Sequence, residues 1–422
     1  MTNVFDEFTW RGLVYDVTEG LAELFAKEKV TAYIGFDPTA SSLHVGNLMT
    51  LMALARLQRF GHRPIALVGG GTGMIGDPSG KSQERTLLTP EQLAVNVAGV
   101  RDQLSRFLDF SGSANGALLV DNFGWLGSID LLSFLRDTGK HFTVNYMLQK
   151  ESVSRRLESE EGISYTEFSY LLLQAYDFLQ LSDRFGCVLQ MGGSDQWGNI
   201  TAGIELIRKL RGTKVHGLVW PLMTTSSGVK FGKTEAGAVW LDAERTSPFH
   251  FYQFWFNTDD RDVVRYLKLF TFLGRETIDE LARATSEQPE SREAQRALAR
   301  EVTTTVHGAD QVTRAERAAA VLFNEPLSAA AVDDVLMVLA DAPSSEVALP
   351  EHGISLVELL ATVKLASSRS EATRLVKSGG VYVNNVRAHD EKARLTIADA
   401  VGGEVIVLRK GRKDQHVVRV RR

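Results

Sequence analysis

Short apolar runs alternate with helical patterns along the first half of the chain. The runs indicate buried strands, and the stretches between them repeat apolar residues at helical spacing. Strands are expected over residues 31–35, 64–69, 117–121 and 187–191, and helices over residues 47–60, 90–108 and 129–135. This alternation predicts an α/β domain with a Rossmann-like, doubly wound parallel sheet. Ligands of such sheets bind at the carboxyl ends of the strands.

The pattern changes after residue 247. Strand signals vanish from residue 248 to about residue 323, and apolar residues recur at helical spacing. Residues 341–353 contain the Pro, Ser and acidic residues of an exposed linker. Two helical patterns and two strand-like runs follow. We therefore expect an α/β domain over 1–247, a helical domain over 248–340, a linker over 341–353 and a small α+β domain over 354–422.

Composition narrows the class of protein. The chain has 422 residues, of which 44% are hydrophobic, and this is enough for more than one core. Its one cysteine, Cys187, cannot form an internal disulfide, which fits a reducing compartment. The chain has no run of about 18 apolar residues and no signal-peptide pattern at its start. We expect a cytoplasmic protein without a membrane segment.

The net charge of −5 hides an asymmetry. Residues 362–422 contain 14 lysines and arginines against 6 acidic residues, so this end carries +8 and the rest of the chain −13. A basic end on an acidic body suggests that a polyanion binds there, although a solvated basic surface would have the same composition.

The glycine-rich stretch GGGTGMIGDPSGKS, residues 69–82, matches neither common nucleotide motif. No helical pattern opens at the third glycine of its GxGxxG, as a dinucleotide fold requires, and its GKS ending misses the P-loop spacing by one residue. The stretch is either a structural turn or a turn that brings backbone close to a ligand. Asp77, Lys81 and Arg85 lie in or just after it.

The helix expected over residues 165–180 is apolar around most of its circumference, yet it carries a polar stripe. Tyr170, Gln174 and Asp177 are spaced i, i+4 and i+7 and so share one face. A buried ionisable group must be paired or must face a wet cavity. The stripe is therefore an internal hydrogen-bond network or the wall of a pocket for a polar small molecule.

Three further stretches combine glycine with polar residues. QMGGSDQWGN, residues 190–199, ends a strand and offers an acceptor to a ribose. TTSSGVKFGKTEAG, residues 224–237, is a polar loop with two lysines that could close on phosphates or simply be solvated. SSLHVGNLM, residues 41–49, joins a strand to a helix that Ser41 or Ser42 could cap.

Together these blocks resemble the class I aminoacyl-tRNA synthetases and, within them, the bacterial-type tyrosyl-tRNA synthetase family. HVGN stands where the family has HIGH, and KFGKT stands where it has KMSKS. YIGFDPT, GDPSGKS, YTEFSYLLLQAYD and GGSDQWGN are similar to the family's own blocks. The segment SSRSEATRLVKSGGVYVNN is similar to an S4-type RNA-binding module, which gives the basic end a function. The similarity covers nearly the whole chain.

The resemblance implies that tyrosine is activated by ATP with Mg²⁺ and then transferred to tRNA(Tyr), in a homodimer with no tightly bound cofactor and no structural metal. In-line phosphoryl substitution needs positioning and charge stabilisation, and several donors around a polyphosphate provide both. The implied catalytic residues are Thr39, His44, Asn47, Lys81, Arg85, Lys230, Lys233 and Thr234. Those implied to bind ATP are Gly35, Asp37, His44, Gly46, Asn47, Gly193, Asp195, Gln196 and Lys233.

The resemblance also assigns the amino-acid site. Tyr33 and Asp177 would bind the substrate phenol, and a site built to hydrogen-bond a hydroxyl rejects the analogue that lacks it, as tyrosine enzymes reject phenylalanine. The full implied set for tyrosine is Tyr33, Asp77, Tyr170, Gln174, Asp177 and Gln190, and that for tRNA is Arg369, Arg374 and Lys377.

Two departures from the family pattern accompany these assignments. Asn47 replaces the last histidine of HIGH, and its amide can donate as an imidazole does. Phe231 and Gly232 replace the middle of KMSKS, with both lysines kept. The alternatives are a tryptophanyl enzyme of the same fold, a non-catalytic RNA-binding protein on this scaffold, and a different adenylyl-transferring enzyme.

Overall fold

The computed structural model describes residues 3–79, 87–158, 162–228, 231–234, 237–323, 326–327, 331–339, 342–350, 352–411 and 414–421. The chain divides into two compact units, Met1–Thr246 with Phe254–Val306, and Ser247–Gln253 with His307–Arg422. The helical region expected over residues 248–340 is therefore shared between the two units. Among the described residues, no helix combines the length and apolar character needed to span a bilayer.

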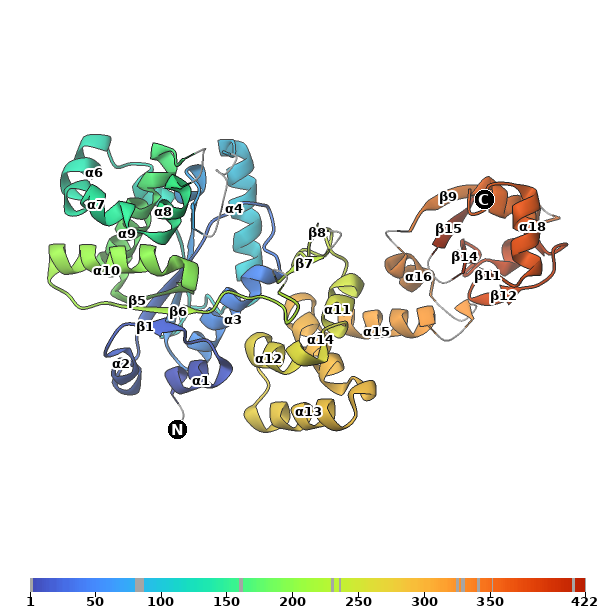
Figure 1. Cartoon of the computed structure of the whole chain (residues 1–422), viewed down its shortest axis with the longest axis horizontal. Helices are drawn as coiled ribbons and strands as arrows, with labels where there is room; N and C mark the ends of the chain where they lie inside the picture. The colour runs from blue at the N-terminus through green and yellow to red at the C-terminus, as the bar shows by residue number, and fades with distance from the viewer. Residues whose placement is uncertain are drawn as a thin grey trace. The chain divides into compact units, whose positions relative to one another are not determined.

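A six-stranded sheet forms the centre of the first unit (Figure 1). Its order is β1-β6-β5-β2-β3-β4, and all pairs are parallel except β1 with β6. The strands are β1 (Asp16–Val17), β2 (Thr31–Phe36), β3 (Arg63–Val68), β4 (Leu118–Asp121), β5 (Cys187–Gly193) and β6 (His216–Trp220). The predicted parallel sheet is confirmed, with β1 and β6 added. The strand order reverses between β2 and β5, and a ligand crevice is expected at that switch point.

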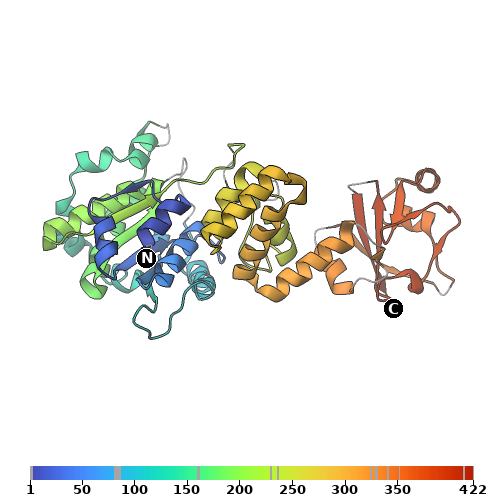
Figure 2. The same cartoon turned by 90° about the horizontal axis from the view of Figure 1, so that it is seen from below.

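Helices cover both faces of this sheet. Because crossovers between parallel strands are right-handed, the reversal of strand order places α10 on the face opposite α3 and α4 (Figure 2). The helices are α1 (Val4–Arg11), α2 (Leu21–Lys27), α3 (Val45–Arg59), α4 (Pro90–Leu104), α5 (Phe123–Leu126), α6 (Leu131–Asp137), α7 (Val144–Leu148), α8 (Glu151–Leu157), α9 (Tyr165–Phe185) and α10 (Trp197–Arg211). Phe178 of α9 and Leu206 of α10 are fully buried in the core that these helices share with the sheet.

Residues 248–323 contain no strand, and every one of them is described, so the helical prediction for this stretch is confirmed. The helices are α11 (Pro248–Phe256), α12 (Asp260–Phe270), α13 (Arg275–Glu287), α14 (Glu293–His307) and α15 (Ala309–Phe323). Asp259 caps α12 by accepting from the backbone N–H of Arg261. Trp255, Tyr266 and Phe270 pack ring against ring and join α11 to α12.

The C-terminal part of the second unit is a small α+β domain. Its sheet has the order β12-β11-β14-β15-β9, and Asn384 and Asn385, both at positive φ, form the two-residue turn between β11 and β12. The elements are α16 (Val332–Val338), β9 (Ser344–Ala348), β10 (Ile354–Ser355), α17 (Leu356–Thr362), α18 (Arg369–Lys377), β11 (Val381–Val383), β12 (Val386–Ala388), β13 (Arg394–Leu395), β14 (Val405–Lys410) and β15 (Asp414–Arg421).

One sequence expectation in this domain is corrected. Residues 341–353 were expected to be an exposed linker, but Ser344–Ala348 form β9, which pairs in parallel with β15. The burial pattern of β9 alternates between exposed and intermediate, so its side chains carry little hydrophobic signal. Backbone hydrogen bonds to a distant strand, rather than local composition, make this segment a strand.

Candidate active site

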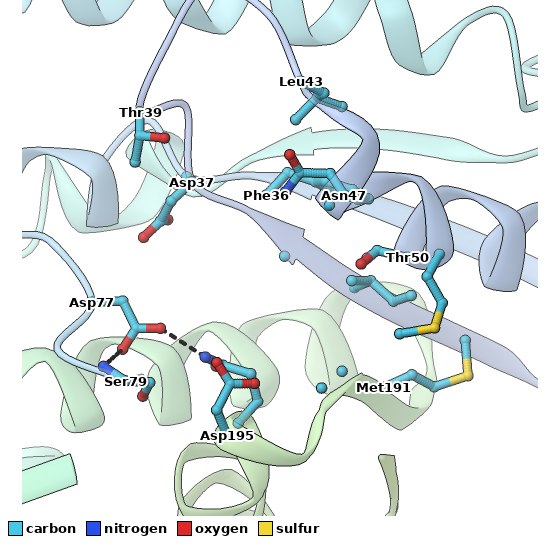
Figure 3. A pocket seen from close by; sticks show the side chains of 18 of the residues that line it. Phe36, Asp37, Thr39, Leu43, Asn47, Thr50, Asp77, Ser79, Met191 and Asp195 are labelled. Atoms are coloured by element: carbon cyan, nitrogen blue, oxygen red, sulfur yellow. Dashed lines mark hydrogen bonds between the residues drawn. The ribbon is translucent and has the colours of Figure 1, made fainter. Parts of the chain in front are cut away.

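A pocket of about 650 Å³ opens at the carboxyl ends of β2 and β5, where the strand order reverses (Figure 3). Its walls come from β2, α3, the glycine-rich turn after β3, α9, β5 and the segment 220–238. The residues singled out from the sequence that line it are Tyr33, Gly35, Asp37, Thr39, His44, Gly46, Asn47, Asp77, Tyr170, Gln174, Asp177, Gln190, Gly193, Asp195 and Gln196.

A buried carboxyl forms one end of the pocket. Asp177 is 2% exposed, and its two oxygens accept hydrogen bonds from Trp125 Nε1 at 2.7 Å and Asn122 Nδ2 at 2.9 Å. Burial raises the pKa of Asp177 to about 7, although these two hydrogen bonds oppose the shift. The carboxyl is thus held by donors from a neighbouring segment and keeps lone pairs for a ligand.

Two buried polar atoms of the pocket have no hydrogen-bond partner among the described residues. They are the hydroxyl of Tyr33, a residue 1% exposed, and Oε1 of Gln190, a residue 2% exposed. The pKa of Tyr33 is raised well above its usual value by burial and then by the charge of Asp177. An unpaired buried polar atom is costly, so both atoms indicate a polar ligand that completes them.

Tyr170 and the glycine-rich turn meet at Asp37, just after β2. Tyr170 Oη donates to Asp37 Oδ2 at 2.8 Å, and Thr72 Oγ1 donates to Asp37 Oδ1 at 2.7 Å. Thr72 belongs to a short 3₁₀ turn, Thr72–Met74, and no α-helix opens at Gly76, as the sequence indicated. The turn therefore supplies a side chain that fixes a pocket carboxylate.

Three further polar residues of the pocket, Gln174, Gln196 and Asp77, form a hydrogen-bonded chain that begins at Asn199. Asn199 Nδ2 donates to Gln174 Oε1 at 2.9 Å, Gln174 Nε2 donates to Gln196 Oε1 at 3.2 Å, and Gln196 Nε2 donates to Asp77 Oδ2 at 2.7 Å. Asp77 also accepts from the backbone N–H of Ser79, and Figure 3 shows both bonds of this carboxylate. The polar stripe of α9 is thus both an internal network and a pocket wall.

The HVGN motif is a helix cap. His44 is the N-cap of α3, and its Nδ1 accepts from the N–H of Gly46 at 3.0 Å. Asn47 Oδ1 accepts in turn from the N–H of His44 at 3.1 Å, which completes a capping box. The expectation that Ser41 or Ser42 caps this helix is wrong. Because Oδ1 of Asn47 serves the cap, its amide NH₂ is the group available to a ligand.

Gly232 of the KFGKT motif packs directly on this cap. A Cβ built on Gly232, whose φ is +82°, would lie 2.8 Å from Val45 Cγ2 and 3.2 Å from the nitrogen of Gly46. The backbone N–H of Val45 donates to the carbonyl of Val239 at 2.9 Å, beyond the loop. Only glycine fits this close approach, which accounts for one departure from the KMSKS pattern.

The other departure, Phe231, anchors the loop. Its side chain is 6% exposed and stacks on Phe270 with ring centroids 5.2 Å apart and an interplanar angle of 13°. Tyr266 and Trp255 also contact its ring. Phe231 is thus fixed to α12, next to Gly232 at the cap of α3.

The structure describes the predicted phosphate-binding cations only in part. Lys233 and Thr234 form the short strand β7, which pairs with β8 (Gly237–Ala238). Lys81, Arg85 and Lys230 lie outside the described residues. Within the described part of the chain, no group of three or more His, Cys, Asp or Glu could hold a metal ion.

The predicted RNA-binding residues lie on α18. Arg369 pairs with Glu358 at 2.7 Å, and Lys377 pairs with Glu391 at 2.8 Å. Arg374 lies on the same helix, between them in the sequence.

Sequence reasoning missed several residues of the pocket. Asn122 and Thr72 line it, and Trp125 reaches it only through Asp177. Asn122 directly follows β4, and a polar residue at the carboxyl end of a parallel strand is a usable signal. Nothing local marks Trp125 or Thr72, because their partners lie 52 and 35 residues away in the chain.

Comparisons with known proteins find class I tRNA synthetases. Residues 26–324 match the family described as "tRNA synthetases class I (W and Y)", and residues 334–418 match "Tyrosine--tRNA ligase SYY-like C-terminal domain". The chain is 55% identical to a tyrosine–tRNA ligase of Roseiflexus castenholzii, with 100% of both chains covered. It is 51% identical to that of Geobacillus kaustophilus, with 98% of both covered.

Solved structures show the same likeness. A C-terminally truncated mitochondrial tyrosyl-tRNA synthetase of Aspergillus nidulans superposes with a TM-score of 0.69 at 31% identity, over 76% of this chain and 95% of that one. A tryptophanyl-tRNA synthetase of Encephalitozoon cuniculi bound to tryptophan has a TM-score of 0.52 at 14% identity and shares the fold alone.

Proposed function

This chain belongs to the tyrosyl-tRNA synthetase family of the class I tRNA synthetases, and on that premise we propose how its residues divide the work. It is a tyrosine–tRNA ligase, which activates L-tyrosine with ATP to tyrosyl-adenylate and pyrophosphate and then transfers tyrosyl to the terminal ribose of tRNA(Tyr). Residues 1–247 carry the chemistry, residues 248–340 form a helical part on the anticodon-arm side, and residues 354–422 bind tRNA.

The tyrosine assignment depends on two groups at the buried end of the pocket, the hydroxyl of Tyr33 and the carboxyl of Asp177. The substrate phenol donates to the carboxyl of Asp177 and accepts from the hydroxyl of Tyr33, for which the described part of the chain offers no partner. Phenylalanine would leave the Tyr33 hydroxyl buried without an acceptor and would give Asp177 no phenol hydrogen bond, so it is rejected. Oε1 of Gln190 is a further acceptor in the same pocket, without a partner among the residues that the structure describes.

The ammonium of tyrosine binds among Tyr170, Gln174 and Asp77. Asp77 supplies the negative charge, and its bonds to Gln196 and Ser79 fix its direction. Support for this assignment comes from the amide chain, which presents oxygens where a cation needs acceptors.

ATP lies along the cap of α3. Gly46 is exposed and leaves the backbone open to the nucleotide, and the N-terminus of a helix favours anions. The other nucleotide contacts come from Asn47, Gly35, Asp37, Gly193, Asp195 and Gln196. The charge that develops on the phosphates is stabilised by Thr39, His44, Lys81, Arg85, Lys230, Lys233 and Thr234. Mg²⁺ enters with ATP, held mainly by phosphate oxygens as is usual for this ion.

The protein works as a homodimer in the cytoplasm. Large apolar side chains are exposed between β4 and the start of α9, among them Leu131 at 68%, Leu132 at 76% and Tyr165 at 74%. Exposed apolar residues at this density are typical of an interface, and a second copy of the chain is the occupant we propose.

The activity is tested by ATP–pyrophosphate exchange. Purified protein with ATP and Mg²⁺ should exchange labelled pyrophosphate into ATP when tyrosine is present, and charge tRNA(Tyr) afterwards. Exchange that is equally fast with tryptophan, or absent with both amino acids, would contradict the assignment. Phenylalanine serves as the matched control for the phenol contacts.

A further inference from the structure

The buried face of α4 contains two amides where apolar residues are expected. α4 buries Leu93, Asn96, Val100, Gln103 and Leu104, all on the side that faces the rest of the unit. Asn96 is 9% exposed and Gln103 is 5% exposed. A buried amide is costly unless it is hydrogen-bonded, so the partners of these two side chains explain why they are there.

All of those partners lie in the connection from β2 to α3. Asn96 Nδ2 donates to the carbonyl of Pro38 at 2.9 Å. Gln103 Oε1 accepts from the backbone N–H of Leu43 at 2.7 Å, and its Nε2 donates to Ser42 Oγ at 2.9 Å. Ser42 Oγ donates onward to the carbonyl of Leu43 at 2.7 Å. The two amides therefore hold both ends of the segment 38–43.

Gly99 brings the middle of this segment against the same helix. A Cβ at position 99 would lie 2.0 Å from the carbonyl oxygen of Ser41 and 3.0 Å from its carbonyl carbon. Both are backbone atoms, so no side-chain rotation could relieve the contact. Asn96, Gly99 and Gln103 follow one another at intervals of three and four residues, and thus form one contact stripe on α4.

The segment held in this way presents groups to the pocket. Thr39 is exposed and His44 is the N-cap of α3, and both line the pocket. Figure 3 shows Thr39, Leu43 and Asn47 on one rim of the pocket, across from Asp77 and Asp195. Within the described part of the chain, the segment has few backbone–backbone hydrogen bonds. Among them are Thr39 N–H to the carbonyl of Asp37 and Leu241 N–H to the carbonyl of Leu43.

We propose that Asn96, Gly99 and Gln103 of α4 are positioning residues for adenylate formation, which fix the segment 38–43 so that Thr39 and His44 meet the phosphates of ATP. This inference rests on the proposed function. Small misplacements of groups that act in the transition state lower rates strongly, whereas the phenol contacts, Tyr33 and Asp177, come from β2 and α9 rather than from the segment 38–43. The three residues should therefore affect the ATP step and leave tyrosine binding intact.

The test compares Gln103→Leu with wild type. It removes both hydrogen bonds at similar side-chain size. We expect the rate constant of tyrosyl-adenylate formation, measured by stopped flow, to fall roughly tenfold to a hundredfold. The dissociation constant for tyrosine, measured without ATP, should stay within about twofold by the same argument. Leu104→Ala is the matched control, because it removes buried packing from the same helix without a bond to the segment. It should lower the thermal midpoint and leave the rate constant near wild type.

Milder variants keep the test decisive if Gln103→Leu does not fold. Ser42→Ala and Asn96→Leu each remove part of the network. The double variant Ser42→Ala with Gln103→Leu should lower the rate constant of adenylate formation little more than Gln103→Leu alone, because both substitutions break the same hydrogen bond. The inference fails if the rate constant and tyrosine binding weaken in parallel, or if Leu104→Ala lowers the rate constant equally. Wild-type protein without tyrosine-dependent exchange would instead overturn the proposed function.

Discussion

Asn122 Nδ2 donates a 2.9 Å hydrogen bond to Asp177 Oδ2, and the same nitrogen lies 3.0 Å from Thr72 Oγ1. The carbonyl oxygen of the Asn122 side chain accepts from the N–H of Gly71 at 2.7 Å. One buried amide thus joins the carboxyl at the end of the pocket to the glycine-rich turn beside Asp37. The phenol and nucleotide parts of the pocket are therefore parts of a single hydrogen-bonded network.

The pKa of Asp177 predicts a pH-dependent stability. Its folded-state pKa is about 7 against an ordinary 3.8, so the folded protein holds a proton that the unfolded chain loses. This group therefore favours folding below about pH 4, and that contribution is lost as pH rises toward 7, by at most about 1.4 kcal/mol per pH unit. Asp177→Asn should gain stability relative to wild type between pH 5 and 7 and show no further change above. Urea unfolding at several pH values measures this difference, and a pH-independent difference would contradict it.

Tyr33→Phe should separate stability from selectivity. Removing an unpaired buried hydroxyl should stabilise the ligand-free protein by about 1 kcal/mol, since such groups cost about 1–3 kcal/mol. The ratio of kcat/KM for tyrosine to that for phenylalanine in pyrophosphate exchange should fall roughly tenfold, because one hydrogen bond to the phenol is lost. The KM for ATP should not change. Unaltered selectivity would remove Tyr33 from the phenol site.

Gly232→Ala should impair the ATP step through a steric clash. The added Cβ meets Val45 and Gly46 at the cap of α3, and φ is +82°. Gly228→Ala is the matched control, because its φ is +79° and no described atom lies within 4 Å of its Cβ. Both variants bear similar backbone strain of about 1 kcal/mol or more. Only Gly232→Ala should slow adenylate formation by more than roughly tenfold in stopped flow, and equal effects would show that strain alone matters.

Substitutions on α18 should weaken tRNA charging in a salt-dependent way. Arg374→Ala and Lys377→Ala should each raise the KM for tRNA and reduce the slope of log affinity against log salt by about 1, if each contacts a phosphate. Arg261→Ala, an exposed arginine of α12 paired with Asp259, is the control. Pyrophosphate exchange should be unchanged in all three. An unchanged salt slope would argue against α18 as the RNA contact.

Leu132→Asp should dissociate the proposed homodimer. Leu132 is 76% exposed, and a charge buried at an apolar interface destabilises association strongly. Sedimentation velocity should then give half the mass of wild type. Val386→Asp, at a residue 53% exposed in the C-terminal domain, should leave the mass unchanged. A wild type that sediments as a monomer would contradict the dimer proposal directly.

The sequence predicted most of the α/β fold because strand and helix periodicities are local signals. The strands expected over 31–35, 64–69, 117–121 and 187–191 correspond to β2, β3, β4 and β5 within one or two residues at each end. It missed β9, whose side chains alternate without a strong apolar pattern and whose pairing partner, β15, lies about 70 residues later. Pairing at that separation cannot be read from a short window.

For the site, the sequence by itself determined which side chains could do the chemistry, since the polar stripe on α9, the HVGN turn and the KFGKT loop are all visible as residue patterns. Only the tertiary structure decided how they are held. It made His44 and Asn47 a mutual cap rather than neighbours on a helix face, and it brought Asn122 and Trp125 to Asp177. Hydrogen bonds of buried groups depend on geometry across distant segments, and for that reason the sequence names the donors and acceptors while the fold alone selects their partners.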